Sequence, residues 1–329
     1  MDSTAEMLID DKTGAPNLDP PRTGYWIGGK IGEWVQGVDQ TGDPIIYSLA
    51  VTKSPFRTRT VVEGSDVLSV VIHSEKPLDH VKTRRAILAF ADAYGFAHDC
   101  NYRIVIDGSP PRGKGLGSSS IDVASALVGV RKQRGLDLSK TELYKVMCIV
   151  ERSDYLFEPQ SIVAANPLDG SHSLITRTPE CSIFAWDTEP LKAVETDALR
   201  HLDQSRRPFE REYRDIFAMI ETGDTSLILQ AATRSAEINN RLLPKAGFET
   251  ALKLVKKSGD IGLAAAHTGT WLGFVLPRPI DESARRLISE FFTGSLRRRP
   301  TLFETGGPGD MGSVAILPPS YGQIKMARR

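Results

Sequence analysis

A glycine-rich segment, Pro110–Ser120, most constrains what this 329-residue chain can fold into. A β-branched run precedes it and an apolar run follows it, so the predicted order is strand, loop, helix. Gly115 and Gly117 allow backbone N–H groups to converge on one point, and Ser118 and Ser119 lie where the helix begins. Free amides at the positive end of a helix dipole favour a phosphate. The segment therefore predicts a phosphate-binding loop. The simpler alternative is a strand-to-helix turn capped by serines.

Two common phosphate-binding motifs do not fit this spacing. A Walker A loop has a lysine directly before its Ser or Thr, whereas Gly117 precedes the serines here. The dinucleotide fingerprint has a third glycine where this chain has Ser120. The remaining pattern, Pro-x-x-x-Gly-Leu-Gly-Ser-Ser, resembles the second motif of the GHMP kinases, which include galactokinase, homoserine kinase and mevalonate kinase. The resemblance implies that ATP is bound by Pro111, Gly113, Lys114, Gly115, Leu116, Gly117, Ser118, Ser119 and Ser120.

Composition narrows the class of partner. Lys+Arg and Asp+Glu both number 41, so no net charge favours nucleic acid. The three cysteines are widely spaced and show no metal-ligand pattern, which is typical of reduced thiols in the cytoplasm. No apolar run has the length of a membrane span, and the acidic, polar beginning of the chain does not resemble a signal peptide. We therefore expect a cytoplasmic protein that acts on small molecules and that can form a homodimer.

A second glycine-rich segment lies near the beginning of the chain. Its form Gly-Glu-x-x-Gln-Gly, with Gly32, Glu33, Gln36 and Gly37, resembles the first motif of the L-threonine kinases, a GHMP branch associated with cobalamin side-chain assembly. Glu33 and Gln36 offer a carboxylate and an amide that suit an ammonium or hydroxyl group. The resemblance implies that these four residues bind the phosphoryl acceptor. A glycine-rich hairpin with exposed polar residues is the alternative.

Two acids mark the end of a helix predicted over residues 139–151, which begins with a capping box, Ser139-x-x-Glu142. Phosphoryl transfer needs a cation that bridges the phosphates and a group that orients the attacking hydroxyl. The resemblance implies that Ser119 and Glu151 hold Mg²⁺ and that Asp154 is catalytic, with Asp169 as its rival. Threonine kinases have Glu-Pro-Thr-Asp here, whereas this chain has Arg152 and a serine in the middle. The alternative is a pair of solvated acids at a helix end.

Two later segments also resemble the threonine-kinase branch. On a helix predicted over residues 226–241, Arg234, Ser235 and Asn239 are candidates to hold an amino acid's carboxylate, which a guanidinium binds in bidentate fashion. The alternative for them is an ordinary polar helix face. Residues 266–273 resemble the third motif, Ala-His-Ser-Gly-Thr-x-x-Gly. Its residues Thr268, Gly269 and Thr270 are assigned to the phosphates or the acceptor through backbone N–H groups, and the preceding histidine is expected to be packed and hydrogen-bonded.

These resemblances predict a two-domain α+β fold. The GHMP kinase pattern implies a ribosomal-protein-S5-domain-2-like ATP-binding domain over residues 23–187, after a flexible tail at 1–22, and a ferredoxin-like domain over 188–329. The activity implied is transfer of the γ-phosphate of ATP to the hydroxyl of L-threonine or a closely related hydroxy-amino acid. Two alternatives stay open: another acceptor, such as homoserine, a sugar or an isoprenoid alcohol, and a catalytically silent binding or regulatory protein on the same fold.

Overall fold

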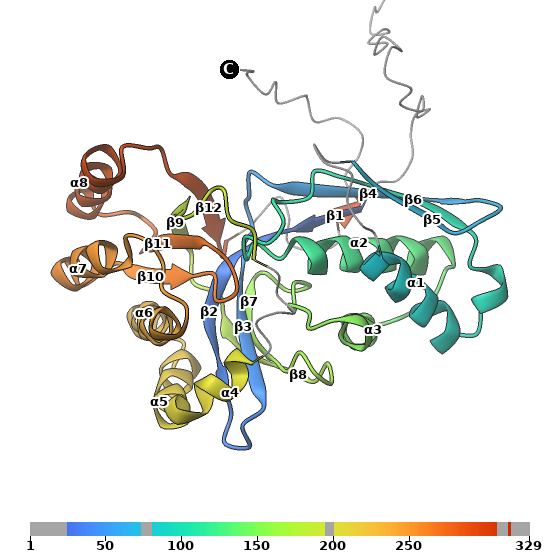
Figure 1. Ribbon diagram of the computed structural model, residues 1–329, viewed down its shortest axis with the longest axis horizontal. Helices are drawn as coiled ribbons and strands as arrows, with labels where there is room; N and C mark the ends of the chain where they lie inside the picture. Colours follow the sequence, from blue (N-terminus) through green and yellow to red (C-terminus); the bar gives the residue numbers. More distant parts are fainter. Residues whose placement is uncertain (1–24, 74–80, 195–200, 308–314, 317–329) are drawn as a thin grey trace, which may run out of the picture.

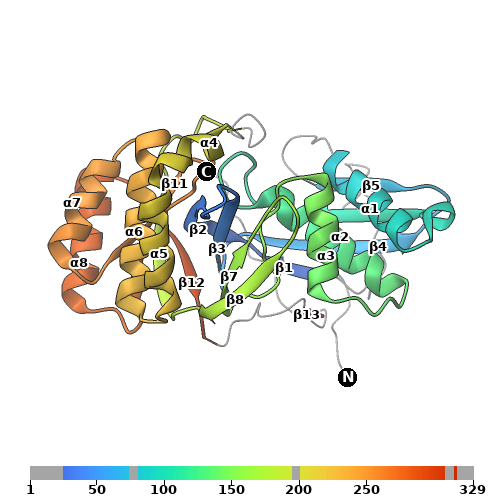
Figure 2. The ribbon, with the colours of Figure 1, turned by 90° about the horizontal axis from the view of Figure 1, so that it is seen from below.

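The computed structural model describes residues 25–73, 81–194, 201–307 and 315–316 of the chain. Two α+β halves lie side by side, each built on one antiparallel or mostly antiparallel sheet with helices against one face (Figures 1 and 2). Mixed helix and sheet was predicted from the sequence, and that fold class is confirmed. The predicted tail at 1–22 lies outside the described residues. Among the described residues, no helix is both long and apolar enough to cross a membrane.

The first half contains a five-stranded sheet with the strand order β13-β1-β4-β6-β5. Its neighbouring strands are antiparallel except for β5 and β6, which are parallel and joined by a crossover through α1. The strands are β1 (Tyr25–Gly28), β4 (Arg57–Gly64), β5 (Ser69–His73), β6 (Tyr102–Asp107) and β13 (Ala315–Ile316). The helices are α1 (Val81–Ala93), α2 (Ser118–Gln133) and α3 (Lys140–Val150), with a 3₁₀ turn at Ala97–Asp99.

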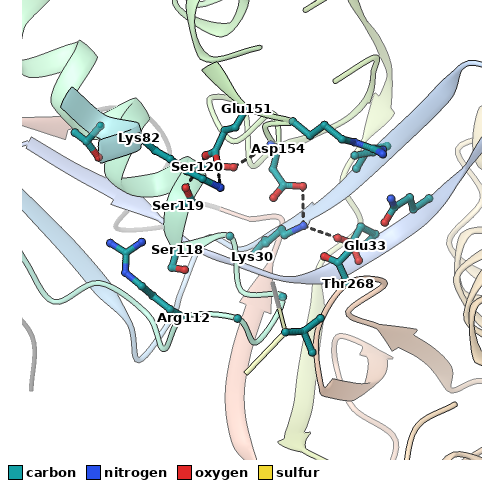
Figure 3. A pocket seen from close by; sticks show the side chains of 18 of the residues that line it. Lys30, Glu33, Lys82, Arg112, Ser118, Ser119, Ser120, Glu151, Asp154 and Thr268 are labelled. Atoms are coloured by element: carbon teal, nitrogen blue, oxygen red, sulfur yellow. Dashed lines mark hydrogen bonds and ion pairs between the residues drawn. The ribbon is translucent and has the colours of Figure 1, made fainter. Parts of the chain in front are cut away.

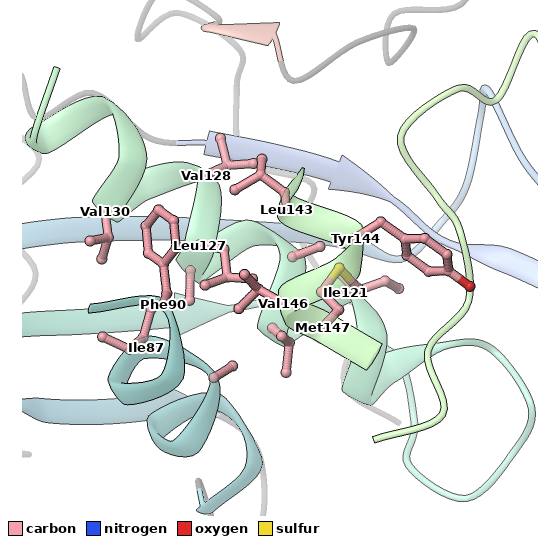
Figure 4. Close-up of a cluster of buried hydrophobic side chains, with 14 of the residues drawn as sticks. Ile87, Phe90, Ile121, Leu127, Val128, Val130, Leu143, Tyr144, Val146 and Met147 are labelled. Atoms are coloured by element: carbon pink, nitrogen blue, oxygen red, sulfur yellow. The ribbon is translucent and has the colours of Figure 1, made fainter. Parts of the chain in front are cut away.

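Helix α2 is the centre of this half. Every residue from Ser120 to Val130 is buried, because the sheet covers one side of the helix and α1 and α3 cover the others. Figure 4 shows Leu127 and Ile121 of α2 among side chains of α1 and α3, including Phe90 and Val146. A helix that is largely apolar and buried on all sides is typical of such a central position. Because the body of α2 is buried, its N-terminus is held in a fixed direction.

The second half contains an eight-stranded sheet with the order β12-β9-β11-β10-β2-β3-β7-β8. Its strands are β2 (Lys30–Val38), β3 (Pro44–Ala50), β7 (Ser161–Ala165), β8 (His172–Arg177), β9 (Cys181–Asp187), β10 (Gly262–Ala265), β11 (Trp271–Pro277) and β12 (Thr301–Thr305). This sheet takes strands from both sides of residue 187, and the domain boundary drawn there stays a prediction.

Five helices flank the eight-stranded sheet (Figure 2). They are α4 (Leu202–Arg206), α5 (Glu210–Glu221), α6 (Thr225–Leu242), α7 (Phe248–Ser258) and α8 (Glu282–Glu290), with a 3₁₀ turn at Arg207–Phe209 and a π-helical turn at Phe291–Leu296. Helix α6 packs on β10 and β2. Ala265 of β10 pairs with Glu33 of β2, so the sheet itself brings two of the glycine-rich segments together.

Most predicted elements occur where the sequence placed them. The capping box expected at residue 139 is present, because Ser139 accepts from the Glu142 amide and the Glu142 carboxylate accepts from Ser139 in return. The helix expected over 226–241 is α6. Helix α7 and the hairpin of β7 and β8 were not predicted.

Candidate active site

A cavity of about 500 Å³ lies where the two halves meet (Figure 3). Its walls come from β2, the glycine-rich loop, the first turns of α1 and α2, and the segment that follows α3. A volume of this size suits a small-molecule site. The residues that line it are Lys30, Glu33, Gln36, Ile46, Val81, Lys82, Thr83, Arg85, Arg112, Gly113, Gly115, Gly117, Ser118, Ser119, Ser120, Glu151, Arg152, Asp154, Val194 and Thr268.

The glycine-rich loop enters α2 as the sequence predicted. Gly113, Gly115 and Gly117 all have positive φ, at 66°, 79° and 72°, a region that residues with a Cβ rarely adopt. Gly117 is the N-cap of α2, and Ser118 and Ser119 follow in its first turn on the cavity wall. The first N–H groups of a helix have no acceptor within it. The cavity therefore has an anion-binding surface at this end.

A buried acid holds the start of the loop against α2. Asp122 accepts a hydrogen bond from Ser109 and pairs with the Arg112 guanidinium at 2.5 Å. Burial raises the pKa of Asp122 to about 6, although Arg112 and Ser109 act in the opposite direction. Arg112 also lines the cavity, so its position is set by a partner behind the wall.

Three loop residues of the predicted ATP site do not line the cavity. The Lys114 ammonium pairs with Asp187 at 2.8 Å and donates to main-chain carbonyls of the segment after β9, including that of Glu189 at 2.9 Å. Leu116 is buried in the apolar core of the second half, and Pro111 is exposed. These three residues connect the loop to its surroundings, and direct contact with ATP stays a prediction for them.

The second and third motifs are in backbone contact. A Cβ added to Gly269 would lie 2.1 Å from the Lys114 carbonyl, and one added to Gly115 would lie 2.3 Å from Ala266. Thr268 lines the cavity, whereas the buried Thr270 donates to Asp187 at 2.6 Å. The third motif therefore packs directly against the glycine-rich loop, through contacts that a residue with a Cβ could not make.

An acid and a hydroxyl meet at the first turn of α2. Ser119 Oγ donates to Glu151 Oε1 at 2.6 Å, and the Lys82 ammonium lies 2.7 Å from Glu151 Oε2 (Figure 3). Glu151 follows directly after α3 and is buried. The structure thus brings together the two residues that the resemblance assigned to Mg²⁺.

Asp154 faces the same cavity from three residues further on. Its backbone N–H donates to Ser120 Oγ at 3.1 Å, which ties it to the α2 N-terminus. Its Oδ1 accepts from the Lys30 ammonium at 2.6 Å and from Ser48 Oγ at 3.2 Å. Asp169, its rival, lies in an exposed turn between β7 and β8 and accepts from the Ser171 amide at 2.8 Å. The structure therefore places Asp154, and not Asp169, on the cavity wall.

Lys30 is a site residue that the sequence interpretation missed. It is buried and bridges Asp154 to Glu33, whose Oε1 lies 2.5 Å from the ammonium. Burial alone would lower the pKa of Lys30, but Asp154 and Glu33 outweigh it and the pKa is raised. The signal was available: Lys30 and Glu33 are the only charged residues between Arg22 and Asp39 in the sequence. β-Bulges in the pairing of β2 with β3 fall within this stretch.

Glu33 continues the network to α6. Its Oε2 accepts from the His267 backbone N–H at 2.8 Å and lies 3.0 Å from His267 Nδ1. Burial would raise the pKa of Glu33, but the Lys30 ammonium and the His267 contacts hold it below its usual range. Burial lowers the pKa of His267 despite Glu33, so the ring is neutral, and its Nε2 lies 3.0 Å from Ser235 Oγ. Both oxygens of Glu33 are thus already engaged, and His267 is packed and hydrogen-bonded.

Of the remaining predicted acceptor residues, Gln36 lines the cavity. The Arg234 guanidinium points toward α5 instead, with Met219 Sδ at 3.5 Å and Asp215 at 4.0 Å. Ser235 and Asn239 are buried behind the cavity wall. Gly32 and Gly37 make close contacts with Ala265 and Tyr213, which a Cβ would obstruct.

Comparisons with known proteins show what this chain is similar to. Residues 81–157 match the family model of the GHMP kinases N terminal domain. The L-threonine kinase of Salmonella typhimurium is 25% identical over 222 residues, which cover 64% of this chain and 71% of that protein. Phosphomevalonate kinase of Streptococcus pneumoniae, solved with phosphomevalonate and AMPPNP, has a TM-score of 0.61 at 16% identity and covers 82% of this chain and 96% of its own. Homoserine kinase of Cytophaga hutchinsonii has a TM-score of 0.60 at 14% identity, with coverages of 91% and 99%.

The family match over residues 81–157, the relatives and the loop at the head of α2 define the class of enzyme: the chain is an ATP-dependent kinase that acts on an alcohol group, and it is similar to the GHMP kinases. Within that class, its sequence is similar to the L-threonine kinases.

Proposed function

We propose that the chain transfers the γ-phosphoryl group of ATP to the side-chain hydroxyl of L-threonine or of a closely related hydroxy-amino acid. One observation carries the proposal: Lys30 fixes Asp154 in the cavity, beside the phosphate-binding N-terminus of α2. The similarity to L-threonine kinases and the Gln36 amide on the cavity wall support the choice of acceptor.

The loop and the first turn of α2 bind the triphosphate. Gly113, Gly115, Gly117 and residues 118–120 line the cavity, where the first N–H groups of α2 offer donors to phosphate, and the Arg112 side chain adds a positive charge at the same end. Ser119 and Glu151 fit a Mg²⁺ ion, because a hydroxyl and a carboxylate 2.6 Å apart are oxygen ligands of the kind it prefers, and phosphates usually complete its shell. Bound Mg²⁺ neutralises charge on the phosphates.

Asp154 accepts the hydrogen of the attacking hydroxyl and orients its oxygen. The Lys30 ammonium has three donors, two of which are used by Asp154 and Glu33. The third is available for the transferring phosphoryl group, where a fixed positive charge stabilises the transition state. Catalysis on this scaffold rests on positioning and charge neutralisation.

The test is acceptor-stimulated ADP release with ATP, Mg²⁺ and L-threonine, L-serine or L-homoserine, compared by kcat/KM. We expect Asp154→Asn to lower kcat by about 10²- to 10⁴-fold, the usual contribution of a general base, with AMPPNP binding unchanged within about threefold. Asp169→Asn is the matched control, since its carboxylate lies in an exposed turn away from the cavity. Full turnover in Asp154→Asn together with a loss in Asp169→Asn would reverse the assignment.

A further inference from the structure

A partly buried arginine on the cavity wall shares one carboxylate with a fully buried arginine behind it. Arg152 lines the cavity with its side chain 13% exposed, and its Nη1 pairs with Asp203 of α4. Arg206, also on α4 and 1% exposed, pairs with the other oxygen of Asp203 at 3.2 Å. We call these three residues the basic triad. Two guanidiniums and one carboxylate give it a formal net charge of +1.

The basic triad has hydrogen-bond donors to spare. Arg152 Nη2 and Arg206 Nε are buried without a hydrogen-bond partner among the described residues, and so is Asn239 Nδ2, whose Oδ1 lies 3.5 Å from Arg206 Nη2. Buried donors in native proteins are almost always satisfied, and an uncompensated buried charge is strongly unfavourable. Of these residues Arg152 lines the cavity, so its Nη2 is the donor that an acceptor oxygen with negative charge can reach there.

A second group with the opposite charge faces the same cavity. Lys30, Glu33 and Asp154, which we call the acidic triad, comprise one ammonium and two carboxylates and have a formal net charge of −1. All three line the cavity together with Arg152. The acceptor end thus presents a positive and a negative group, the arrangement that complements a zwitterion.

Gln36 adds a neutral donor to this end of the cavity. It is 3% exposed and lines the cavity, and its backbone N–H donates to Ser235 Oγ at 3.4 Å. No hydrogen bond joins its side-chain amide to another residue in the part of the chain that the structure describes. Helix α4, which carries Asp203 and Arg206, packs against β2, the strand that carries Gln36. The amide is therefore free to bind a ligand oxygen.

We infer that Arg152, held by Asp203, binds the carboxylate of a zwitterionic amino-acid acceptor beside the Gln36 amide, while Asp154 accepts from its hydroxyl group and the net negative charge of the acidic triad attracts its ammonium group. The inference rests on the proposed function and makes it more specific. The sequence assigned the carboxylate to Arg234. The structure favours Arg152 instead, which is one of the two residues at which this chain departs from the Glu-Pro-Thr-Asp pattern. The inference excludes neutral acceptors such as sugars and isoprenoid alcohols.

The experiment compares three acceptors by ADP release: L-threonine, L-threoninamide, which lacks the carboxylate, and 3-hydroxybutyrate, which lacks the ammonium. We expect the wild type to prefer L-threonine over each analogue by at least about tenfold in kcat/KM. Arg152→Met should raise the KM for L-threonine by about 10- to 100-fold, as expected for loss of a charged hydrogen bond, and leave turnover of L-threoninamide unchanged. Preference over 3-hydroxybutyrate should persist, because the acidic triad is intact.

Controls separate binding from folding. Arg241→Met removes another arginine, 57% exposed on α6 and outside the cavity, and should change none of these ratios. Arg152→Lys keeps the charge but loses the planar fork, so its KM should be intermediate. Thermal melting and AMPPNP binding show whether each variant is folded.

Two results would overturn the inference while leaving the kinase intact: Arg152→Met, folded, with the wild-type preference for L-threonine over L-threoninamide, or Arg234→Met losing that preference instead. Absence of acceptor-stimulated ADP release from the wild type with every hydroxy-amino acid is a different failure. It would remove the proposed function itself, and this inference with it.

Discussion

Replacing Lys30 by methionine tests the central electrostatic claim. The ammonium is 3% exposed and lies 2.5 Å from Glu33 and 2.6 Å from Asp154. Its removal leaves two carboxylates in a buried site with no cation between them. Glu33 retains its two contacts with His267, and Asp154 retains Ser48. Neither set of contacts supplies the lost charge.

The expected loss follows from the burial of this pair. Removing one partner of a buried ion pair costs about 3–5 kcal/mol, because the remaining charge is uncompensated. Separately from this loss of stability, kcat should fall by about 10²- to 10³-fold, because a fixed donor to the transferring phosphoryl group is lost. This is roughly the effect of removing one oxyanion-hole donor. Lys53→Met is the matched control: its ion pair with Glu304, at 2.9 Å, is 49% exposed on the lysine side, and we expect a change below about 1 kcal/mol.

The sign of the pH dependence provides a second check. In the folded wild type, the pKa of Glu33 lies below its ordinary value of 4.5. Its stabilisation is therefore present above pH 4.5 and is lost as the pH falls below that value. Without Lys30, burial raises this pKa, so the carboxyl binds a proton more readily. The stability difference between wild type and Lys30→Met should be largest near pH 7.5, should shrink as the pH falls toward 4.5 because the variant's carboxyl binds a proton, and should shrink further below 4.5 as the wild type loses its stabilisation.

Urea unfolding at pH 7.5 and pH 4.5 measures the stability difference, and steady-state ADP release measures kcat. A Lys30→Met variant that is no less stable than Lys53→Met at pH 7.5 would refute the reasoning. So would a stability difference that grows toward acid pH.

Two further variants test the ends of the nucleotide site. Glu151→Gln should raise the Mg²⁺ concentration for half-maximal activity by roughly 10- to 100-fold, since it removes one charged ligand next to Ser119; a Mg²⁺ titration at fixed ATP measures this, and an unchanged midpoint would exclude Glu151 as a ligand. Gly269→Ala should lower the free energy of unfolding by about 1–3 kcal/mol and weaken AMPPNP binding, because its Cβ would meet the Lys114 carbonyl. Gly294→Ala, which meets nothing within 4 Å, is its control, and equal urea midpoints for the two variants would contradict the packing argument.

Local patterns predicted the conformation of the glycine-rich loop well. This conformation depends on consecutive residues, because positive φ at three glycines and a helix that begins at Ser118 are properties of the segment itself. The same holds for the capping box at Ser139. The helix and strand ranges followed from periodicity for the same reason.

Side-chain direction was the part that the sequence could not supply. Arg234 is adjacent to Ser235 in sequence, but one residue turns a helix by about 100°. Ser235 therefore faces His267, whereas Arg234 faces α5. Lys114 stands within a predicted nucleotide loop, and only the tertiary structure shows Asp187 and its neighbouring carbonyls on the other side. The relation between Lys30 and Asp154 spans 124 positions and has no local signature.

The pairing of Ala265 with Glu33 has a consequence for how substrates enter and products leave. A motion that separated Glu33 from the third motif would require breaking main-chain hydrogen bonds in the middle of the eight-stranded sheet. The rim of the cavity formed by α1 belongs to the other half, so it can move without breaking these bonds. Exchange of ligands is therefore expected at this rim, with the part of the cavity wall formed by β2 held rigid throughout the cycle.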